Sequence, residues 1–130
     1  MSANDPGVSE MDRLPPMTHY ALGLLRRAPR ASRVPEPQAT TLQEGHMAYL
    51  RRLREAGELI TMGPFEGHGD LRGLLVFRTA DLDEARALMR NDPLIAGGQL
   101  VLDLLRWFAP AGLAALSGAS GPARGPSGAD

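Results

Sequence analysis

The sequence predicts an α+β domain with the ferredoxin-like order β-α-β-β-α-β, and three observations support this prediction. Four apolar stretches have the length of strands, at residues 18–27, 58–65, 71–79 and 99–108. Two segments with helical periodicity lie between the first and second stretches and between the third and fourth. A Gly-containing turn of hairpin length joins the second stretch to the third. In this arrangement the sheet is antiparallel and both helices cover one of its faces.

The first half of the predicted domain contains a strand, a proline-rich loop and a helix. Residues 18–27, THYALGLLRR, are a nearly continuous apolar run, and the loop 28–41 contains three prolines. The helix then begins with Thr41 and Glu44 as a capping box and stops at Gly57. A helical pitch of about 100° per residue places its inward-facing residues on one stripe: Leu42, His46, Tyr49, Leu50 and Leu53.

The second half contains a hairpin, a second helix and a last strand. The strands 58–65 and 71–79 are joined by the turn 66–70, EGHGD. The second helix begins at Asp81 or Leu82, with Asp81 as its N-cap, and ends near Asn91. The segment DPLIAGG then turns the chain into the last strand, QLVLDLLRWF.

The folded domain is expected at residues 17–113, between two disordered tails. Residues 1–16 are polar and without periodicity, and residues 114–130 are rich in Gly, Pro, Ser and Ala. No apolar run approaches the ~18 residues of a spanning helix, and the N-terminus lacks the pattern of a secretory signal. The chain contains no cysteine, which removes disulfides and thiolate sites. We therefore expect a cytoplasmic protein with no membrane partner.

The charge distribution argues against a nucleic-acid partner. The formal net charge is -1, whereas nucleic-acid-binding domains usually carry a basic excess on one face. Arg51, Arg52 and Arg54 fall on the sides and back of the first helix, which is typical of a solvated face. One Trp, two Tyr and three Phe leave little for base stacking.

The strands also predict a homodimer. If one face of the sheet were in water, the strands would alternate apolar and polar residues, but ALGLL, LLVF and LVLDLL are nearly continuous apolar runs. Two helices cover only one face, and a monomer would expose a larger apolar patch than monomers usually do. The sequence therefore favours two copies packed sheet to sheet around a shared barrel-like interior over a monomer with a weakly amphipathic sheet.

Unusual residues converge at one end of the predicted fold, the end where the first strand finishes. His46 lies near the start of the first helix, in the centre of its apolar stripe. Gly63-Pro64 interrupts the second strand, His68 lies in the next turn, and Asn91-Asp92-Pro93 ends the second helix. The loop 28–41 reaches the same end. We expect the ligand-binding cleft here, with backbone amides near Gly63 as donors to a substrate oxygen.

Asp92 has two candidate partners. A carboxylate at a helix C-terminus is disfavoured by the helix dipole, by a few tenths to ~1 kcal/mol, so a compensating interaction is expected. The side chain could accept hydrogen bonds from backbone amides of the following turn, because Asp-Pro commonly opens turns. It could instead pair with His46 and fix the tautomer of the imidazole, as for a general base. Spacing alone leaves both alternatives open.

The other polar candidates are assigned to binding. Arg30 and Arg33 lie in the proline-rich loop, where they could attract an anion, and His68 could reach into the cleft. His19 is expected to be a partly exposed strand residue, and Asp103 a polar contact at the dimer seam. Three scattered histidines with no carboxylate at ligand spacing make no metal motif, so we expect no metal and no cofactor.

Several strings of the sequence resemble the YCII-related (YciI-like) domain family. They are GHMAYLRRLREAGELITMGPF, LRGLLVFRTADLDEARALMRNDPLIAGG and LVLDLLRWF, so the resemblance covers nearly all of residues 18–108. It implies a dimeric α+β barrel and an active-site His–Asp pair, which by motif corresponds to His46 and Asp92. Leu94 stands where an aromatic residue often follows the Asp-Pro, and this departure is expected to alter one wall of the pocket.

These residues indicate a small-molecule enzyme that uses His46 as general acid and base and Asp92 as its orienting partner. The expected chemistry is isomerisation, elimination or lactone chemistry on a small polar or aromatic molecule. The alternative is a non-catalytic dimer that binds a metabolite or a protein partner, since the fold does not decide between the two. In either case Gly63, Pro64, His68, Arg30 and Arg33 are the candidate binding residues, and the loop 28–41 is a candidate lid.

Overall fold

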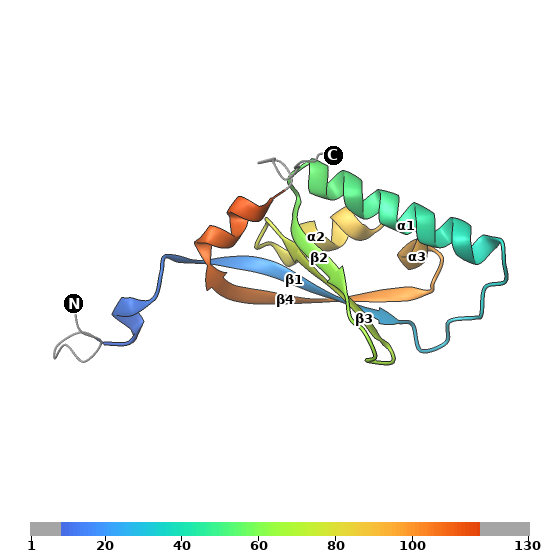
Figure 1. Ribbon diagram of the computed structural model, residues 1–130, viewed down its shortest axis with the longest axis horizontal. Helices are drawn as coiled ribbons and strands as arrows, with labels where there is room; N and C mark the ends of the chain where they lie inside the picture. The colour runs from blue at the N-terminus through green and yellow to red at the C-terminus, as the bar shows by residue number, and fades with distance from the viewer. Residues whose placement is uncertain (1–8, 118–130) are drawn as a thin grey trace.

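The computed structural model describes residues 9–117 and contains one four-stranded sheet with its two longer helices on one side (Figure 1). Along the chain the elements are η1 (Met11–Arg13), β1 (Met17–Arg27), α1 (Gln38–Glu55), β2 (Leu59–Pro64), β3 (Leu71–Phe77), α2 (Leu82–Met89), α3 (Pro93–Ala96), β4 (Leu100–Pro110) and η2 (Ala111–Leu116). The strands and the longer helices confirm the predicted β-α-β-β-α-β order. Within residues 9–117, every helix is too short or too polar to cross a membrane.

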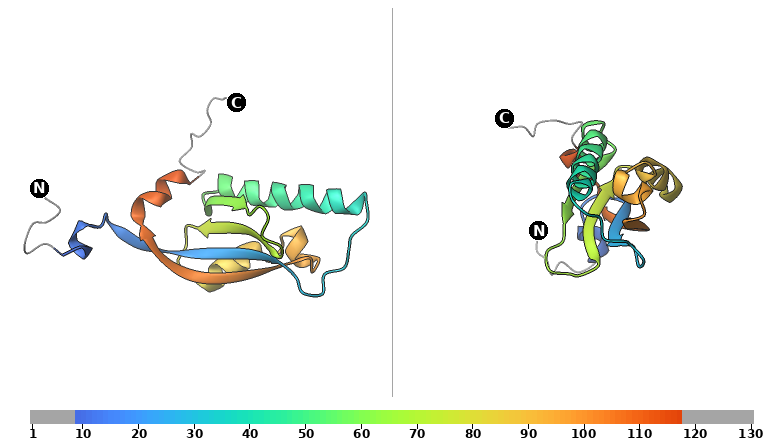
Figure 2. Two further views of the ribbon diagram at one scale, coloured as in Figure 1. Left: turned by 60° about the horizontal axis from the view of Figure 1, so that its bottom comes forward. Right: turned by 90° about the vertical axis from the view of Figure 1, so that its right-hand side faces the viewer.

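The sheet has the strand order β2-β3-β1-β4, and every neighbouring pair is antiparallel. The central strand β1 pairs with β4 from Met17 opposite Pro110 to Arg27 opposite Leu100. The strands β2 and β4 form the two edges of the sheet. Helices α1 and α2 lie side by side across one face, as the right-hand view of Figure 2 shows. This arrangement confirms the ferredoxin-like architecture.

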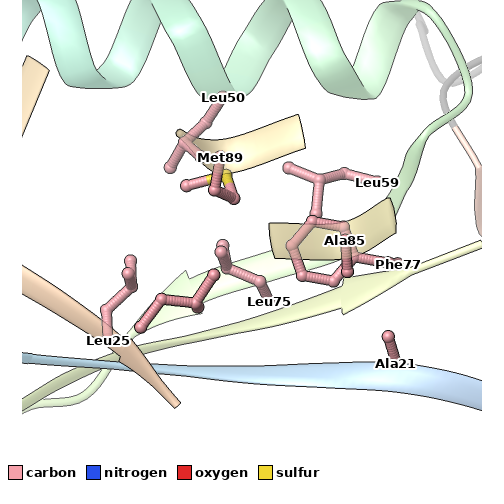
Figure 3. Close-up of a cluster of buried hydrophobic side chains, with 9 residues drawn as sticks. Ala21, Leu25, Leu50, Leu59, Leu75, Phe77, Ala85 and Met89 are labelled. Carbon is pink, nitrogen blue, oxygen red and sulfur yellow. The ribbon is translucent and has the colours of Figure 1, made fainter. Parts of the chain in front are cut away.

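The main core lies between this face of the sheet and the helices (Figure 3). Every second residue of a strand points to the same face, so β1 contributes Ala21 and Leu25. Gly23 lies between them, and a Cβ there would be 2.9 Å from Cδ1 of Leu102. The glycine therefore lets the strand pack closely. The buried members of this core are Ala21, Leu25, Leu50, Leu59, Leu75, Phe77, Ala85, Met89 and Leu102.

The first helix begins one turn earlier than predicted, so the expected capping box is wrong. Helix α1 begins at Gln38, and Thr41 already lies within it, with its N–H bonded to the Pro37 carbonyl (3.1 Å). The first turn is instead satisfied by Glu36, whose Oε1 accepts from the Thr40 N–H (3.2 Å) and hydroxyl (2.7 Å). The predicted cap at Asp81 is present in α2, since its side chain accepts from the N–H groups of Asp83 and Glu84.

A short helix follows α2 where the sequence predicted only a turn. Helix α2 ends at Met89, and Asp92 is the N-cap of α3, with Pro93 at its first position. Proline suits this position because its missing N–H has no partner in a helix. Asp92 therefore precedes a helix, where a carboxylate is favoured. The expectation that its charge lies at an unfavourable helix terminus was wrong.

The ends of the described chain contain helical turns that were not predicted. The 3₁₀ helix η1 falls within the expected tail 1–16, and η2 continues past the expected boundary at residue 113. Leu113 and Ala114 of η2 pack on a small second core of Tyr20, Ile60, Val76 and Ala109. This non-local packing explains the helical turn. Residues 1–8 and 118–130, which make up the rest of both predicted tails, lie outside the described residues.

The sheet face opposite α1 and α2 is apolar and only partly covered. The helix η2 covers one end of it, over Tyr20 and Val76. Leu105 on the edge strand β4 is 53% exposed and Trp107 is 39% exposed. We refer to the uncovered part as the apolar sheet face, which consists of Leu22, Leu24, Leu74, Val101, Leu105 and Trp107.

Candidate functional site

His46 lies in the first half of α1, on the side of the helix that packs toward the sheet. The residue is only 6% exposed, and Leu50, one turn later, is part of the main core. The histidine therefore continues the buried stripe of the helix, as its spacing predicts. A buried imidazole needs a hydrogen-bond partner, and the partner comes from the segment between α2 and α3.

That partner is Asp92, which is fully buried. Its Oδ2 accepts hydrogen bonds from the backbone N–H groups of Leu94 (3.1 Å) and Ile95 (3.2 Å). Its Oδ1 lies 2.7 Å from Nδ1 of His46. Both alternatives left open by the sequence are thus present, one on each carboxylate oxygen. Because both oxygens are bonded, the cost of removing the carboxylate from water is largely offset.

This contact determines which nitrogen of His46 faces a ligand. An ionised carboxylate only accepts, so Nδ1 donates, and the lone pair of the neutral ring is on Nε2. Among residues 9–117, no hydrogen bond is made to Nε2. The atom is also not one of the buried polar atoms without a partner in this part of the chain, so it is accessible. His46 also lines the adjacent cavity. Nε2 is therefore the basic atom that is open to that cavity.

Two neighbours of His46 on α1 set the approach of this helix to α2 and α3. A Cβ added at Gly45 would lie 3.2 Å from Cγ of Pro93, so the glycine allows α1 and α3 to come close. On the other side of His46, the Tyr49 hydroxyl donates a hydrogen bond to the carbonyl of Leu88 in α2. The two contacts flank the bond between His46 and Asp92.

A cavity of about 870 Å³ opens beside His46. Small-molecule sites usually have volumes of about 300–1,000 Å³, so the cavity has the size of a ligand site. It lies between α1, the loop that precedes this helix, and the ends of β1, β2 and β3. Its polar lining residues are Arg27, Ser32, Arg33, Gln43, His46, Arg72 and Gln99. The larger part of the wall is apolar and includes Leu25, Leu42, Met47, Leu50, Met62, Leu75, Leu94 and Leu100.

The structure brings together some of the predicted binding residues and not others. Arg33, Gly63 and Pro64 line the cavity beside His46. Arg30 and His68 do not, and His68 stacks edge-on against the ring of Phe65 in the exposed β2–β3 turn, with centroids 6.1 Å apart. The loop 28–37 contributes Ser32, Arg33 and Val34, so it forms one wall of the cavity.

Two arginines that line the cavity, Arg27 and Arg72, were not among the binding residues predicted from the sequence. Arg27 is the last residue of β1, and Arg72 lies at the start of β3, at the end of the sheet where the cleft was expected. Their position at that end could have been deduced from the strand order. Arg27 lies two residues after Leu25 on β1, so strand alternation could also have given its direction. Arg72 lies at an irregularity of the β1–β3 pairing, where Leu25 faces Gly73 and Arg26 faces Leu71, and such a register shift leaves no clear sequence signal.

The remaining polar candidates have other partners. His19 stacks on Phe108, with centroids 4.8 Å apart. Asp103 accepts a 2.6 Å hydrogen bond from Nε of Arg26 and pairs with its charge. Within residues 9–117, no group of three or more acidic, histidine or cysteine side chains is arranged to hold a metal ion.

The chain is similar to a known domain family and to solved structures. The model of the YCII-related domain family matches residues 24–107. Among curated proteins, none matches the sequence. A similar solved structure is 5-chloro-2-hydroxyhydroquinone dehydrochlorinase (TftG) from Burkholderia phenoliruptrix AC1100, in complex with 2,5-dihydroxybenzoquinone. It is 24% identical, the match covers 66% of this chain and 92% of that chain, and the TM-score is 0.46.

Proposed function

The chain belongs to the YCII-related domain family, and from this premise we propose that it is a small-molecule enzyme whose acid–base residues are His46 and Asp92. One observation supports this proposal most strongly. A buried carboxylate lies 2.7 Å from Nδ1 of a histidine whose ring lines a ligand-sized cavity. A general base needs a lone pair directed at the substrate and a partner that fixes the ring, and this arrangement supplies both.

The two residues have different roles in the proposed mechanism. Asp92 is held by two backbone N–H groups of α3, and it orients the ring and stabilises the imidazolium that forms when Nε2 takes a proton. Of these two residues only His46 contacts the substrate, through Nε2, so His46 is the catalytic residue and Asp92 acts through it. The sequence contains neither cysteine nor lysine, so the proposed mechanism uses no cysteine thiolate and no lysine Schiff base.

Proton transfer by His46 accounts for two classes of reaction. In an isomerisation, Nε2 takes a proton from one atom of the substrate, a double bond shifts, and the same nitrogen returns the proton to another atom. In an elimination, Nε2 takes a proton from carbon, the C–H electron pair forms a new double bond, and the leaving group departs with its own bonding pair. The proton then passes from Nε2 to water. Neither reaction needs an oxidant or a second substrate.

We also propose that the protein is a homodimer. The apolar sheet face is exposed at Leu105 and Trp107, and patches of this kind usually mark an interaction surface. A second copy, packed through the same face, would cover it without leaving an unpaired surface. The ion pair between Arg26 and Asp103 lies on this face and would become a polar contact of the interface.

The proposal is tested by turnover with a matched pair of variants. The wild-type protein is incubated in D₂O with a panel of lactones, enolisable acids and halogenated phenols, and conversion or deuterium uptake is followed by mass spectrometry. His46→Asn places an amide N–H near the former Nδ1, so that Asp92 keeps a donor, but it removes Nε2. We expect turnover to fall by about 10²–10⁴-fold. Arg30→Gln, in the loop but outside the cavity, is the control.

Two results would contradict this proposal. Equal turnover by the His46→Asn variant, with its fold intact by circular dichroism, would exclude the histidine as the catalytic residue. Saturable binding of compounds that the wild-type protein never converts would favour the alternative, a dimer that binds a metabolite without catalysis.

A further inference from the structure

Three arginine side chains line the cavity beside His46, from three separate parts of the chain. Arg27 ends β1, Arg33 lies in the following loop, and Arg72 lies near the start of β3. No aspartate or glutamate is among the described residues that line the cavity. The net charge of the whole chain is -1, so the positive charge of this cavity is a local feature and does not follow from a basic protein.

The backbone holds two of these arginines close together. The Arg27 N–H donates to the carbonyl of Asp70 (2.8 Å), two residues before Arg72. The guanidinium of Arg27 also donates to the carbonyl of Ala31 (2.9 Å). This bond ties the end of β1 to the loop segment that contributes Ser32 and Arg33. Strand pairing and a loop contact therefore hold the segments that carry the three arginines together beside the cavity.

None of these three arginines forms an ion pair within residues 9–117. Their neighbour Arg26, which belongs to the opposite sheet face, is neutralised by Asp103 at 2.6 Å. Asp92, the partner of His46, is fully buried and bonded through both oxygens. The residues that line the cavity therefore include three arginines and no carboxylate.

The rest of the wall constrains the other part of the ligand. Leucine and methionine side chains from α1, β2 and β3 line the cavity, among them Leu42, Met47 and Met62. A simple inorganic anion would leave this apolar surface without a partner. A ligand with a compact apolar body and one anionic group would satisfy both kinds of wall.

We propose that the ligand of this cavity is a small organic anion, an apolar or aromatic body bearing a carboxylate or phosphate group bound by Arg27, Arg33 and Arg72. The inference rests on the proposed function, because this anion is the class of substrate on which His46 acts. The arginines orient the anionic end, and the apolar body places the reacting atom at Nε2. Guanidinium groups suit this role because they bind carboxylate and phosphate oxygens in pairs.

Binding is measured by calorimetry on the full chain with four probes. Benzoate and phenyl phosphate carry the two possible anionic groups on the same ring, benzamide is the neutral counterpart of benzoate, and inorganic phosphate lacks the ring. We expect one or both aromatic anions to bind at least about tenfold more tightly than benzamide. We also expect the affinity to fall as salt is raised. The tighter of the two aromatic anions identifies the anionic group.

The variants Arg33→Gln and Arg72→Gln test the assignment of the wall. Both residues are exposed, so their replacement leaves the core intact. Each variant should weaken binding of the preferred anion by about tenfold or more. Arg30→Gln removes the same charge from the same loop outside the cavity, and its affinity should stay at the wild-type value.

Three outcomes would overturn the inference. The first is that neither aromatic anion binds more tightly than benzamide at millimolar concentration. The second is an equal loss of affinity in Arg30→Gln and Arg33→Gln. The third is equal affinity for inorganic phosphate and phenyl phosphate. The His46→Asn variant separates this inference from the proposed function. If it binds the anion normally but the wild-type protein converts nothing, only the proposed function fails. If it loses turnover while the anions never bind, only the ligand class fails.

Discussion

Asp92 divides its two oxygens between a helix terminus and a histidine. Oδ2 accepts two backbone N–H groups of α3, and Oδ1 lies 2.7 Å from Nδ1 of His46. The first set of bonds fixes the carboxylate, and the fixed carboxylate in turn fixes the ring. The orientation of Nε2 toward the cavity therefore depends on a helix of only one turn.

Asp92→Asn should invert the tautomer of His46. If the asparagine oxygen keeps the N–H groups of Leu94 and Ile95, its amide nitrogen faces Nδ1 and donates to it. The histidine proton then moves to Nε2, and the lone pair no longer faces the cavity. We expect kcat/KM to fall by about 10²–10⁴-fold, measured by steady-state kinetics, and nitrogen NMR of the ring should report the change of tautomer.

The control for this variant is Asp83→Asn, which removes an exposed carboxylate from α2 outside the site. It should retain wild-type kinetics. Wild-type kcat/KM in a folded Asp92→Asn variant would show that the orientation of the ring does not matter for turnover.

The sequence singled out His46 and Asp92 because each was expected to break a local rule, although Asp92 proves to be a favourable N-cap of α3. The ionisable ring in an apolar stripe and the carboxylate before a proline can both be read from the sequence. The family resemblance then predicted that the two residues form a pair. Arg27 and Arg72 are not unusual in their local sequence, so they were not singled out. The direction of Arg72 depends on a register shift opposite Leu25 and Arg26, which is a property of the paired strands.

At the scale of elements, α1 acts as a single body that presents Gly45, His46 and Tyr49 to the segment formed by α2 and α3. The glycine allows close approach to Pro93, and the Tyr49 hydroxyl binds the Leu88 carbonyl. Periodicity predicted which side of α1 is buried. It did not predict where α1 begins, because Glu36, outside the periodic pattern, caps the first turn.

Tyr49→Phe should loosen the contact between α1 and α2. The loss of one partly buried hydrogen bond should lower the free energy of unfolding by ~0.5–1.5 kcal/mol. Because the same contact holds His46 near Asp92, kcat should fall more than the affinity for substrate. Denaturant unfolding and steady-state kinetics measure the two effects.

Tyr20→Phe is the matched control, since the Tyr20 hydroxyl also binds backbone carbonyls, those of Pro110 (2.8 Å) and Ala111 (3.1 Å), on the opposite sheet face. It should lose similar stability and keep its kcat. A similar kcat in both variants would mean that the Tyr49 contact has no part in positioning the histidine.

Asp81→Ala should destabilise α2 without altering the site. The Asp81 side chain accepts from the N–H groups of Asp83 (2.9 Å) and Glu84 (3.1 Å) at the first turn. Loss of an N-cap of this kind lowers the free energy of unfolding by ~0.5–2 kcal/mol, measured by denaturant unfolding. The kcat per folded molecule should stay unchanged, and a large fall in kcat would indicate that the N-terminus of α2 contributes to the site.

At the scale of the whole molecule, the order of strands and helices was predictable because long apolar runs and helical periodicity are local signals. The 3₁₀ helix η2 was not predictable in this way. It is held by the packing of Leu113 and Ala114 on Tyr20 and Val76, which are distant in the sequence. The apolar sheet face was anticipated from strands without alternation, and the structure leaves it exposed at Leu105 and Trp107.

Leu105→Glu should shift the proposed homodimer toward monomer. Leu105 is 53% exposed on the apolar sheet face, and a charge there would be desolvated in a sheet-to-sheet interface. Sedimentation velocity should show a smaller species for this variant. Arg51→Glu, on the exposed side of α1, should sediment as the wild type. A wild-type protein that sediments as a monomer at micromolar concentration would contradict the proposed dimer.

Proton transfer by Nε2 of His46 can be measured by comparing the rate of conversion of one substrate by the wild type and by His46→Asn. We expect this rate to fall by about 10²–10⁴-fold in the variant, with the fold and the binding of the aromatic anion preserved. Conversion at the wild-type rate by a folded His46→Asn variant would show that Nε2 of His46 does not transfer the proton.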